Sequence, residues 1–127
     1  MKNIWSQNLD EISSTARETL GALRFSDDGR AYRYGQLIDQ AGAQGEVVYD
    51  ASATEGEFKY TTDYTGGSGT SAKVAGVIHH DVSTFTINYY GWFQVGGFCP
   101  MVRTDAGVAA GEALVGHTVD GEADTMA

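Results

Sequence analysis

Three adjacent residues, His79, His80 and Asp81, are the strongest candidates for chemistry in this sequence. Imidazole nitrogens and carboxylate oxygens bind transition metals and transfer protons in catalysis. Neighbouring side chains on a strand point to opposite faces, so a strand here would keep the two histidines from sharing one metal ion. A site would need one histidine together with Asp81, another acid and the distant His117, and no ligand spacing indicates such a meeting. We therefore expect no metal and no cofactor, and we interpret these residues as solvated residues at a strand end.

The remaining nucleophiles and acids form no catalytic motif in the sequence. Cys99 is the sole cysteine, which excludes an intramolecular disulfide and a thiolate-rich metal site. It precedes Pro100 in an apolar run, with no basic residue within three positions to activate a thiolate. The sequence has no Gly-x-Ser-x-Gly elbow. Two of its 17 acids would form a glycosidase pair only at a separation that sequence does not give. We therefore predict that the protein is not an enzyme.

The composition predicts a single domain of short strands. A chain of 127 residues with 42% hydrophobic residues is long enough to bury a core. Its 17 glycines and single proline, together with many Thr, Tyr, Val and Phe residues, favour strands joined by tight turns.

The charge and the hydrophobic pattern exclude several kinds of partner. A net charge of -9 with scattered cations disfavours binding to nucleic acid, which requires a concentrated basic patch. The opening "MKNIWSQNLDEISS" lacks the apolar core of a signal peptide, and no stretch approaches the roughly 20 apolar residues of a membrane span. We expect intracellular synthesis and no membrane partner.

Alternating apolar and polar residues predict an all-β domain over residues 21–127. A hairpin is expected over 21–36 around Asp28-Gly29, because this pair favours a tight turn. Further strands are predicted at 45–50, 56–64, 73–80, 83–90 and 92–98, with a strand, turn and strand over 101–116. About eight short strands indicate a small β-barrel or a β-tulip-like domain.

Residues 1–20 differ in composition from the rest of the chain and are predicted to be an extended N-terminal arm. This segment is polar, has no glycine and carries a narrow apolar stripe at Leu9, Ile12, Ala16 and Leu20. Such a stripe is thin for a free-standing helix. Two alternatives remain: an arm that orders against another molecule, or a short helix that lies on its own barrel.

A dense band of aromatic residues stands between the predicted strands and the C-terminal segment. If Tyr89 faces the core, then Tyr90 faces outward, and beyond the bend at Gly91 either Trp92 or Phe93 must do the same. Outward Tyr and Trp side chains often anchor protein interfaces. The band therefore predicts both core and interface residues, with sugar stacking as a further alternative.

The segment "YYGWFQVGGFCPMVRTDAGVAAGEALVGHTVDGEADT" resembles a recurrent segment in capsid decoration, or capsid cement, proteins of tailed bacteriophages. The early hairpin "GALRFSDDGRAYRYGQ" is similar to the opening strands of that family. Members often continue past the "DGEAD" turn, so a strand from another subunit is one way in which the barrel could close. The matching residues are Gly91, Trp92, Gln94, Val95, Gly97, Gly107, Val108, Ala109, Ala110, Gly111, Ala113, Leu114, Val115, Asp120, Gly121, Ala123 and Asp124.

The resemblance implies a structural virion protein on the outer surface of a phage capsid. Such a protein would bind the major capsid protein, stabilise contacts between its subunits, and self-associate, with a trimer as the first expectation. A head-fibre, tail or carbohydrate-binding module that uses exposed aromatics is the alternative. The residues expected to contact the partner are Ile4, Trp5, Leu9, Ile12, Tyr90 and Trp92.

Overall fold

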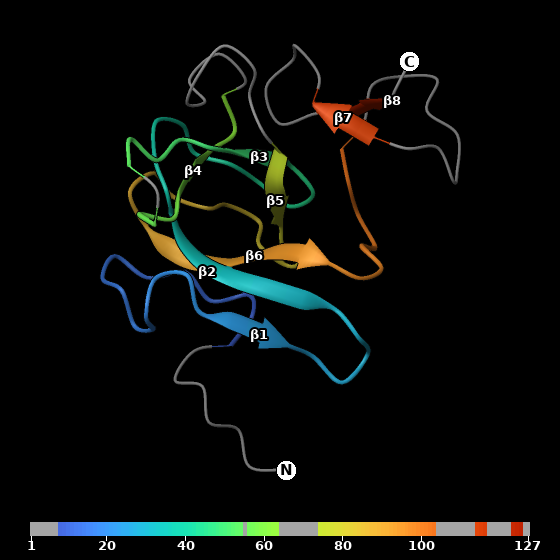
Figure 1. The fold of residues 1–127 in the computed structure, drawn as a ribbon, viewed down its shortest axis with the longest axis horizontal. Helices are drawn as coiled ribbons and strands as arrows, with labels where there is room; N and C mark the ends of the chain where they lie inside the picture. The colour runs from blue at the N-terminus through green and yellow to red at the C-terminus, as the bar shows by residue number, and fades with distance from the viewer. Residues whose placement is uncertain (1–7, 55, 64–73, 104–113, 117–122, 126–127) are drawn as a thin grey trace.

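The described part of the chain contains eight short strands and no helix (Figure 1). The computed structural model describes residues 8–54, 56–63, 74–103, 114–116 and 123–125, the last two as backbone. None of these residues belongs to a helix long and apolar enough to cross a membrane. The strands are β1 (Leu23–Phe25), β2 (Ala31–Leu37), β3 (Val47–Asp50), β4 (Lys59–Thr61), β5 (Val74–Ile78), β6 (Tyr90–Gly96), β7 (Leu114–Gly116) and β8 (Ala123–Thr125).

Five strands close into a small barrel within this one chain. The sheet has the order β1-β2-β4-β3-β5-β6, and β6 pairs again with β2 to complete the circle. All pairings are antiparallel except that of β2 with β4. One edge of β2 is occupied by β6, and the other is shared by β1 and β4. The barrel therefore needs no strand from another subunit, and β1 is an extra strand outside it. A separate hairpin pairs β7 with β8.

Most of the predicted strands are confirmed and the one at 83–90 is wrong, whereas the pair expected over 101–116 lies largely outside the described residues, which hold only β7 there. The first hairpin turns where Asp28-Gly29 predicted it, and the Ser26 amide donates to the carbonyl of Arg30 at 2.9 Å. The strands expected at 45–50 and 73–80 correspond to β3 and β5. No strand forms over 83–89, because Asn88 adopts a φ of 69° and the chain turns there. Ile87, which was expected inside, is consequently exposed.

The described part of the N-terminal arm lies along the outside of the barrel. The backbone of Ser13 exchanges two hydrogen bonds with that of Tyr90, at 3.0 and 2.8 Å. The Arg17 amide donates to the hydroxyl of Tyr34 at 3.0 Å. Residues 8–20 form no helix, and Ala16 from the predicted helical stripe is exposed. This part of the arm thus packs on its own barrel, as in one alternative, but as an irregular chain rather than a helix.

The closed barrel has one hydrophobic core inside it and a second on its outer face, and Val47 and Tyr49 form a third, smaller buried cluster. Inside the barrel, Phe93 packs against Phe85 and Tyr60, with ring centroids 5.0 and 4.9 Å apart. The adjacent Trp92 faces outward and packs against Tyr34 with ring centroids 5.1 Å apart. This outer core is covered by Tyr90 and by residues 8–22, which we call the N-terminal segment and which contribute Leu9 and Ala22. Alternation along β6 therefore supplies both cores, because both faces of the strand are covered.

Candidate functional site

The two histidines lie side by side just beyond β5. The strand ends at Ile78, and the Val82 amide donates to the carbonyl of His79 at 3.0 Å, which turns the chain. The imidazole rings of His79 and His80 stack with centroids 4.2 Å apart. The expectation that they point to opposite faces is wrong, because that rule applies to a strand and these residues form a turn.

This turn brings three potential metal ligands together. Ligand atoms of His79, His80 and Asp81 lie within 4.8 Å of one another. Nε2 of His80 is 3.5 Å from Oδ2 of Asp81, whereas Nδ1 of His79 already accepts a hydrogen bond from the Asp81 amide at 3.1 Å. A metal ion held by all three side chains would have to compete with that bond. His117, the fourth residue considered from sequence, lies outside the described residues.

Acidification is expected to destabilise the fold through His79. Burial lowers the pKa of His79, the neighbouring His80 and Arg30 lower it further, and Asp81 and Asp10 oppose the shift. The unfolded chain therefore binds more protons, so the free energy of unfolding falls as the pH drops through about 6.5, by at most about 1.4 kcal/mol per pH unit. Urea unfolding between pH 8 and pH 5.5 measures this slope. The slope should be shallower in His79→Gln, and an unchanged slope would show that His79 is not its source.

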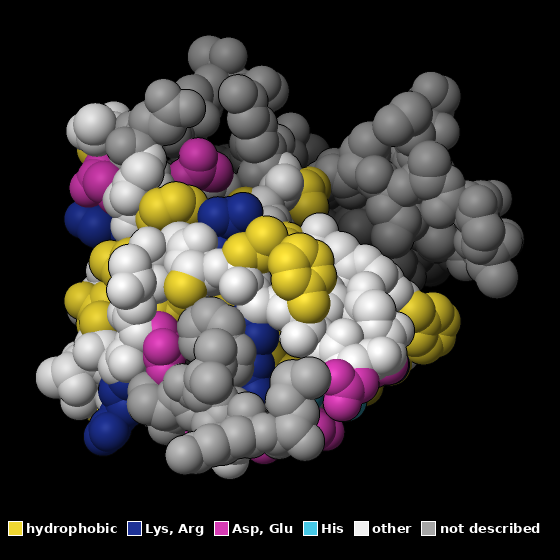
Figure 2. All heavy atoms as spheres, turned by 60° about the horizontal axis from the view of Figure 1, so that its bottom comes forward, with side chains coloured by type: hydrophobic (Ala, Val, Ile, Leu, Met, Phe, Trp, Pro, Cys, Tyr) yellow, Lys and Arg dark blue, Asp and Glu magenta, His cyan; other side chains and the backbone are white. Residues whose placement is uncertain are grey.

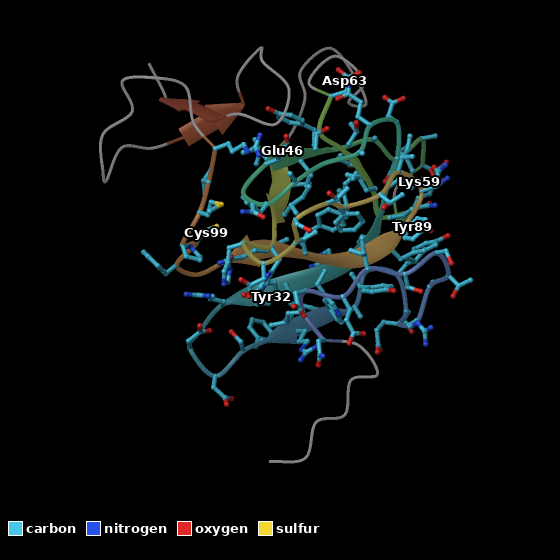
Figure 3. All side chains as sticks on the ribbon, turned by 180° about the vertical axis from the view of Figure 1, so that it is seen from behind. Tyr32, Glu46, Lys59, Asp63, Tyr89 and Cys99 are labelled. Atoms are coloured by element: carbon cyan, nitrogen blue, oxygen red, sulfur yellow. The ribbon has the colours of Figure 1, made fainter. Side chains whose placement is uncertain are left out.

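Cys99 is half-buried beyond the end of β6 (Figure 3). Burial raises the pKa of its thiol, and the Sγ atom donates a hydrogen bond to the carbonyl of Met101 at 3.2 Å. The raised pKa favours an unreactive thiol rather than a nucleophilic thiolate.

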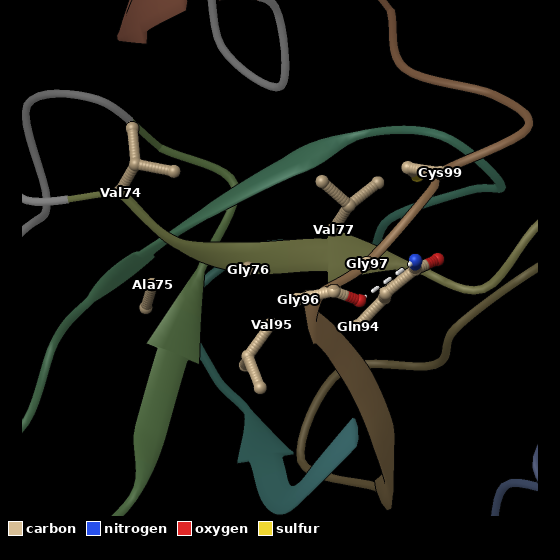
Figure 4. Close-up of a pocket in the computed structure, with 9 residues that line it drawn as sticks. All are labelled: Val74, Ala75, Gly76, Val77, Gln94, Val95, Gly96, Gly97 and Cys99. Carbon is tan, nitrogen blue, oxygen red and sulfur yellow. Dashed lines mark hydrogen bonds between the residues drawn. The ribbon is translucent and has the colours of Figure 1, made fainter. Parts of the chain in front are cut away.

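An apolar groove follows the seam between β5 and β6 (Figure 4). The two strands pair only at Val77–Gln94 and Ile78–Phe93, so the groove opens where they diverge. It has a volume of about 250 Å³, and the Gln94 side-chain amide in its lining already donates to the carbonyls of Gly96 and Phe98, at 3.2 and 2.8 Å. The nine lining residues are labelled in the figure, and they offer few groups that could recognise a polar ligand.

A larger groove opens at one end of the barrel, and we call it the barrel mouth. It has a volume of about 600 Å³ and receives residues from all five barrel strands. Four lining residues are polar and three are apolar beyond glycine, so the groove offers hydrogen-bonding groups beside an apolar surface. The lining consists of Arg33, Asp50, Ser52, Gly56, Phe58, Tyr60, Ala75 and Val95.

The residues predicted to contact a partner occupy different places. Ile4 and Trp5 lie outside the described residues. Leu9 and Ile12 pack against the outer and inner core, and Tyr90 is half-buried on the outer core. Trp92 is only 1% exposed, because the N-terminal segment covers the outward face on which it stands. In this fold Trp92 therefore contacts its own chain rather than a surface open to a partner.

Two other aromatic residues are exposed instead. Phe25 is 69% and Phe98 is 75% exposed. The sequence analysis predicted a hairpin at Phe25 and assigned this residue no contact. For Phe98, in the aromatic band, it did not decide between a core and an interface role. One sequence feature could have predicted the exposure of Phe98. It follows Gly96-Gly97 and precedes Cys99-Pro100, and glycine and proline at these positions favour a chain that leaves the sheet.

The fold and these surfaces define a small closed β-barrel with a groove at its mouth and two exposed aromatic side chains, Phe25 and Phe98. The chain matches no known family model, no curated protein and no solved structure.

Proposed function

We propose that this protein is a structural virion component that binds the outer surface of a phage capsid and stabilises contacts between major capsid protein subunits. The resemblance of residues 89–125 to capsid decoration proteins supports the proposal. The structural observation that carries it is a pair of exposed aromatic side chains, Phe25 on β1 and Phe98 just beyond β6, next to the first hairpin.

Phe25 lies on β1 and Phe98 lies two residues beyond the end of β6, and we call these two residues the aromatic edge. Phe25 pairs with Ala31, and Ala31 pairs with Gly96, two residues before Phe98. A Cβ atom on Gly97 would lie 2.7 Å from the carbonyl oxygen of Gly29, so this residue packs closely on the first turn. The aromatic edge is thus tied to the barrel through backbone contacts. Aromatic side chains presented rigidly are effective interface anchors, since binding orders them at little entropic cost.

Charges around the aromatic edge indicate the chemistry of its partner. The guanidinium of Arg30 lies 5.8 Å from the ring centre of Phe98 and forms an ion pair with Asp28 at 3.1 Å. Asp27 and Asp28 are exposed on the intervening turn. Hydrophobic side chains on the visible face reach the surface in separate groups among acidic and basic ones (Figure 2). A partner surface with apolar hollows and a basic rim would complement this edge, and the net charge of -9 would assist the encounter.

Many copies on one capsid would act together, so modest affinity at each site is sufficient. Self-association, with a trimer as the first expectation, would add contacts across a symmetry axis. A head-fibre or tail position uses the same kind of surface and is distinguished by where the protein sits on a particle.

Removing the aromatic edge is expected to weaken attachment without unfolding the protein. In Phe25→Ser/Phe98→Ser, both changes are at exposed positions, so the free energy of unfolding should change by less than about 1 kcal/mol. Co-sedimentation with phage heads that lack the protein should weaken more than about tenfold, equivalent to about 1.4 kcal/mol. Ile87→Ser is the matched control, because Ile87 is an exposed apolar residue beside the other end of β6.

Two results would reject the proposal. One is equal binding of heads by the double variant and the wild type, which would exclude the aromatic edge as the contact. The other is the absence of the protein from purified particles by mass spectrometry. A cryo-electron reconstruction that places the protein on the tail would move the function to that part of the virion.

A further inference from the structure

The lining of the barrel mouth contains polar side chains whose hydrogen-bonding capacity is only partly used by the described residues. Nη1 of Arg33 donates to the carbonyl of Gly21 at 2.9 Å, and Oδ1 of Asp50 accepts from the Ser52 amide at 3.0 Å. Among the described residues, neither Arg33 nor Asp50 forms an ion pair, although both line the same groove. Each therefore retains hydrogen-bonding capacity toward the groove.

Tyr60 lines the groove together with these two charged residues. Its ring is 5% exposed and packs edge-on against Phe93. Burial raises the pKa of the Tyr60 hydroxyl, while Arg33 lowers it and Asp50 raises it, so both charges act at this hydroxyl. The described residues offer that hydroxyl no hydrogen-bond partner, so it remains available to a ligand.

Phe58 forms an apolar wall of the groove in a strained conformation. Its φ of 54° is rare for a bulky residue and costs about 1–3 kcal/mol. The Gln36 amide donates to its carbonyl at 3.0 Å, and the guanidinium of Arg33 lies 5.5 Å from its ring centre. The ring also occupies the space that a side chain at Gly21 would need. Strained residues are concentrated at ligand sites, and here the strain places an aromatic ring beside the polar groups.

The chemistry of the lining selects a class of ligand. One cation and one anion give the mouth no net charge, which disfavours phosphates, and polar groups beside Tyr60 disfavour a fatty chain. A sugar hydroxyl both donates and accepts, so adjacent hydroxyls can bond Arg33 and Asp50 at once. The C–H face of a sugar ring can pack on Phe58 and Val95. The volume of about 600 Å³ lies within the range of small-molecule sites and accommodates one or two sugar rings.

We propose that the barrel mouth is a binding site for a neutral sugar, recognised by Arg33, Asp50 and Tyr60 against the wall formed by Phe58. This site is separate from the aromatic edge, and sugar binding and capsid attachment can succeed or fail independently. If the virion location holds, the site would let the protein contact glycans outside the particle.

Titration with defined sugars tests the site on the full chain. The probes are glucose, galactose, mannose, N-acetylglucosamine, lactose and maltose, followed by amide NMR at up to about 10 mM, since single-sugar affinities are weak. At least one sugar should shift the amides of Ser52, Phe58 and Tyr60. Asp50→Asn should weaken that binding about tenfold or more, because the amide keeps the bond to Ser52 but loses the charge. Tyr60→Phe should also weaken it, whereas the control Asp28→Asn should not.

Two results of these titrations would overturn the sugar site. The proposal is overturned if none of the six sugars shifts these amides, or if sugar shifts persist unchanged in both Asp50→Asn and Tyr60→Phe. Inorganic phosphate is the counter-probe. Binding of phosphate at the mouth in the absence of any sugar binding would overturn the sugar assignment in favour of an anion site at Arg33.

Discussion

Trp92→Ala is expected to lower the free energy of unfolding by about 3–5 kcal/mol, the range typical of a large aromatic residue removed from a core. Trp92 is 1% exposed and packs edge-on against Tyr34, and the guanidinium of Arg24 lies 5.5 Å from its ring centre. A loss of this size is a substantial part of the 5–15 kcal/mol that stabilises an ordinary domain. Urea denaturation followed by circular dichroism measures it.

The same substitution should loosen the N-terminal segment before the barrel unfolds. The outer core is closed by Leu9 and Ala22, so removal of the indole takes away the surface on which this segment packs. Arg17 is exposed and lies within the segment, so its trypsin cleavage under native conditions should accelerate. Trp92→Phe is the matched control and should cost less, since it keeps an aromatic ring against Tyr34. Wild-type stability in Trp92→Ala would contradict the assignment of Trp92 to a core.

Much of the barrel could be predicted from local sequence signals. Asp28-Gly29 defined the first hairpin, and the apolar runs at 45–50 and 73–80 located β3 and β5. These features depend on residues close together in the chain. The strand expected at 83–90 failed because its alternation is the same in a strand and in a chain that turns at Asn88. The parallel pairing of β2 with β4 was not predictable, because it joins segments separated by a long crossover.

The second core shows a different limit of sequence reasoning. Alternation correctly indicated that adjacent residues of β6 face opposite ways, but it does not say which faces are covered. Trp92 was expected at a partner interface, and it is buried because residues 8–22 return across the outer face of the barrel. A polar segment with isolated apolar residues gives no signal of this return. The apolar residues at Leu9 and Ile12 were the available hint, and they pack on the two cores without a helix.

The candidate sites were least predictable where they depend on several strands. His79 and His80 were noticed from sequence, but their stacking follows from the end of β5 at Ile78. Phe58 and Tyr60 were expected on one face of a strand. Their meeting with Arg33 and Asp50 requires the barrel to close, since these residues come from three different strands and a loop.

The close contact between β2 and β4 leads to the second large effect, which is expected for Gly35→Ala. A Cβ atom at this position would lie 2.8 Å from the carbonyl oxygen of Phe58 and closer still to the ring of Tyr60. The carbonyl of Phe58 accepts a hydrogen bond from the Gln36 amide, so it cannot retreat without weakening the pairing that closes the barrel. We expect a loss of about 1–3 kcal/mol or more, as for other overpacked interiors.

Gly96→Ala separates this clash from a general effect of replacing a strand glycine. Gly96 lies on β6 opposite Ala31, and an added Cβ would meet only the Cβ of Ala31, at 3.4 Å. That contact is ordinary in length, so the stability of Gly96→Ala should stay within about 0.5 kcal/mol of the wild type. Gly35→Ala should also perturb the amides of Phe58 and Tyr60, whereas Gly96→Ala should leave them in place. Equal melting temperatures for the two variants would mean that β4 approaches β2 less closely than this structure shows. In that case Phe58 and Tyr60 would not stand beside Arg33 in the barrel mouth.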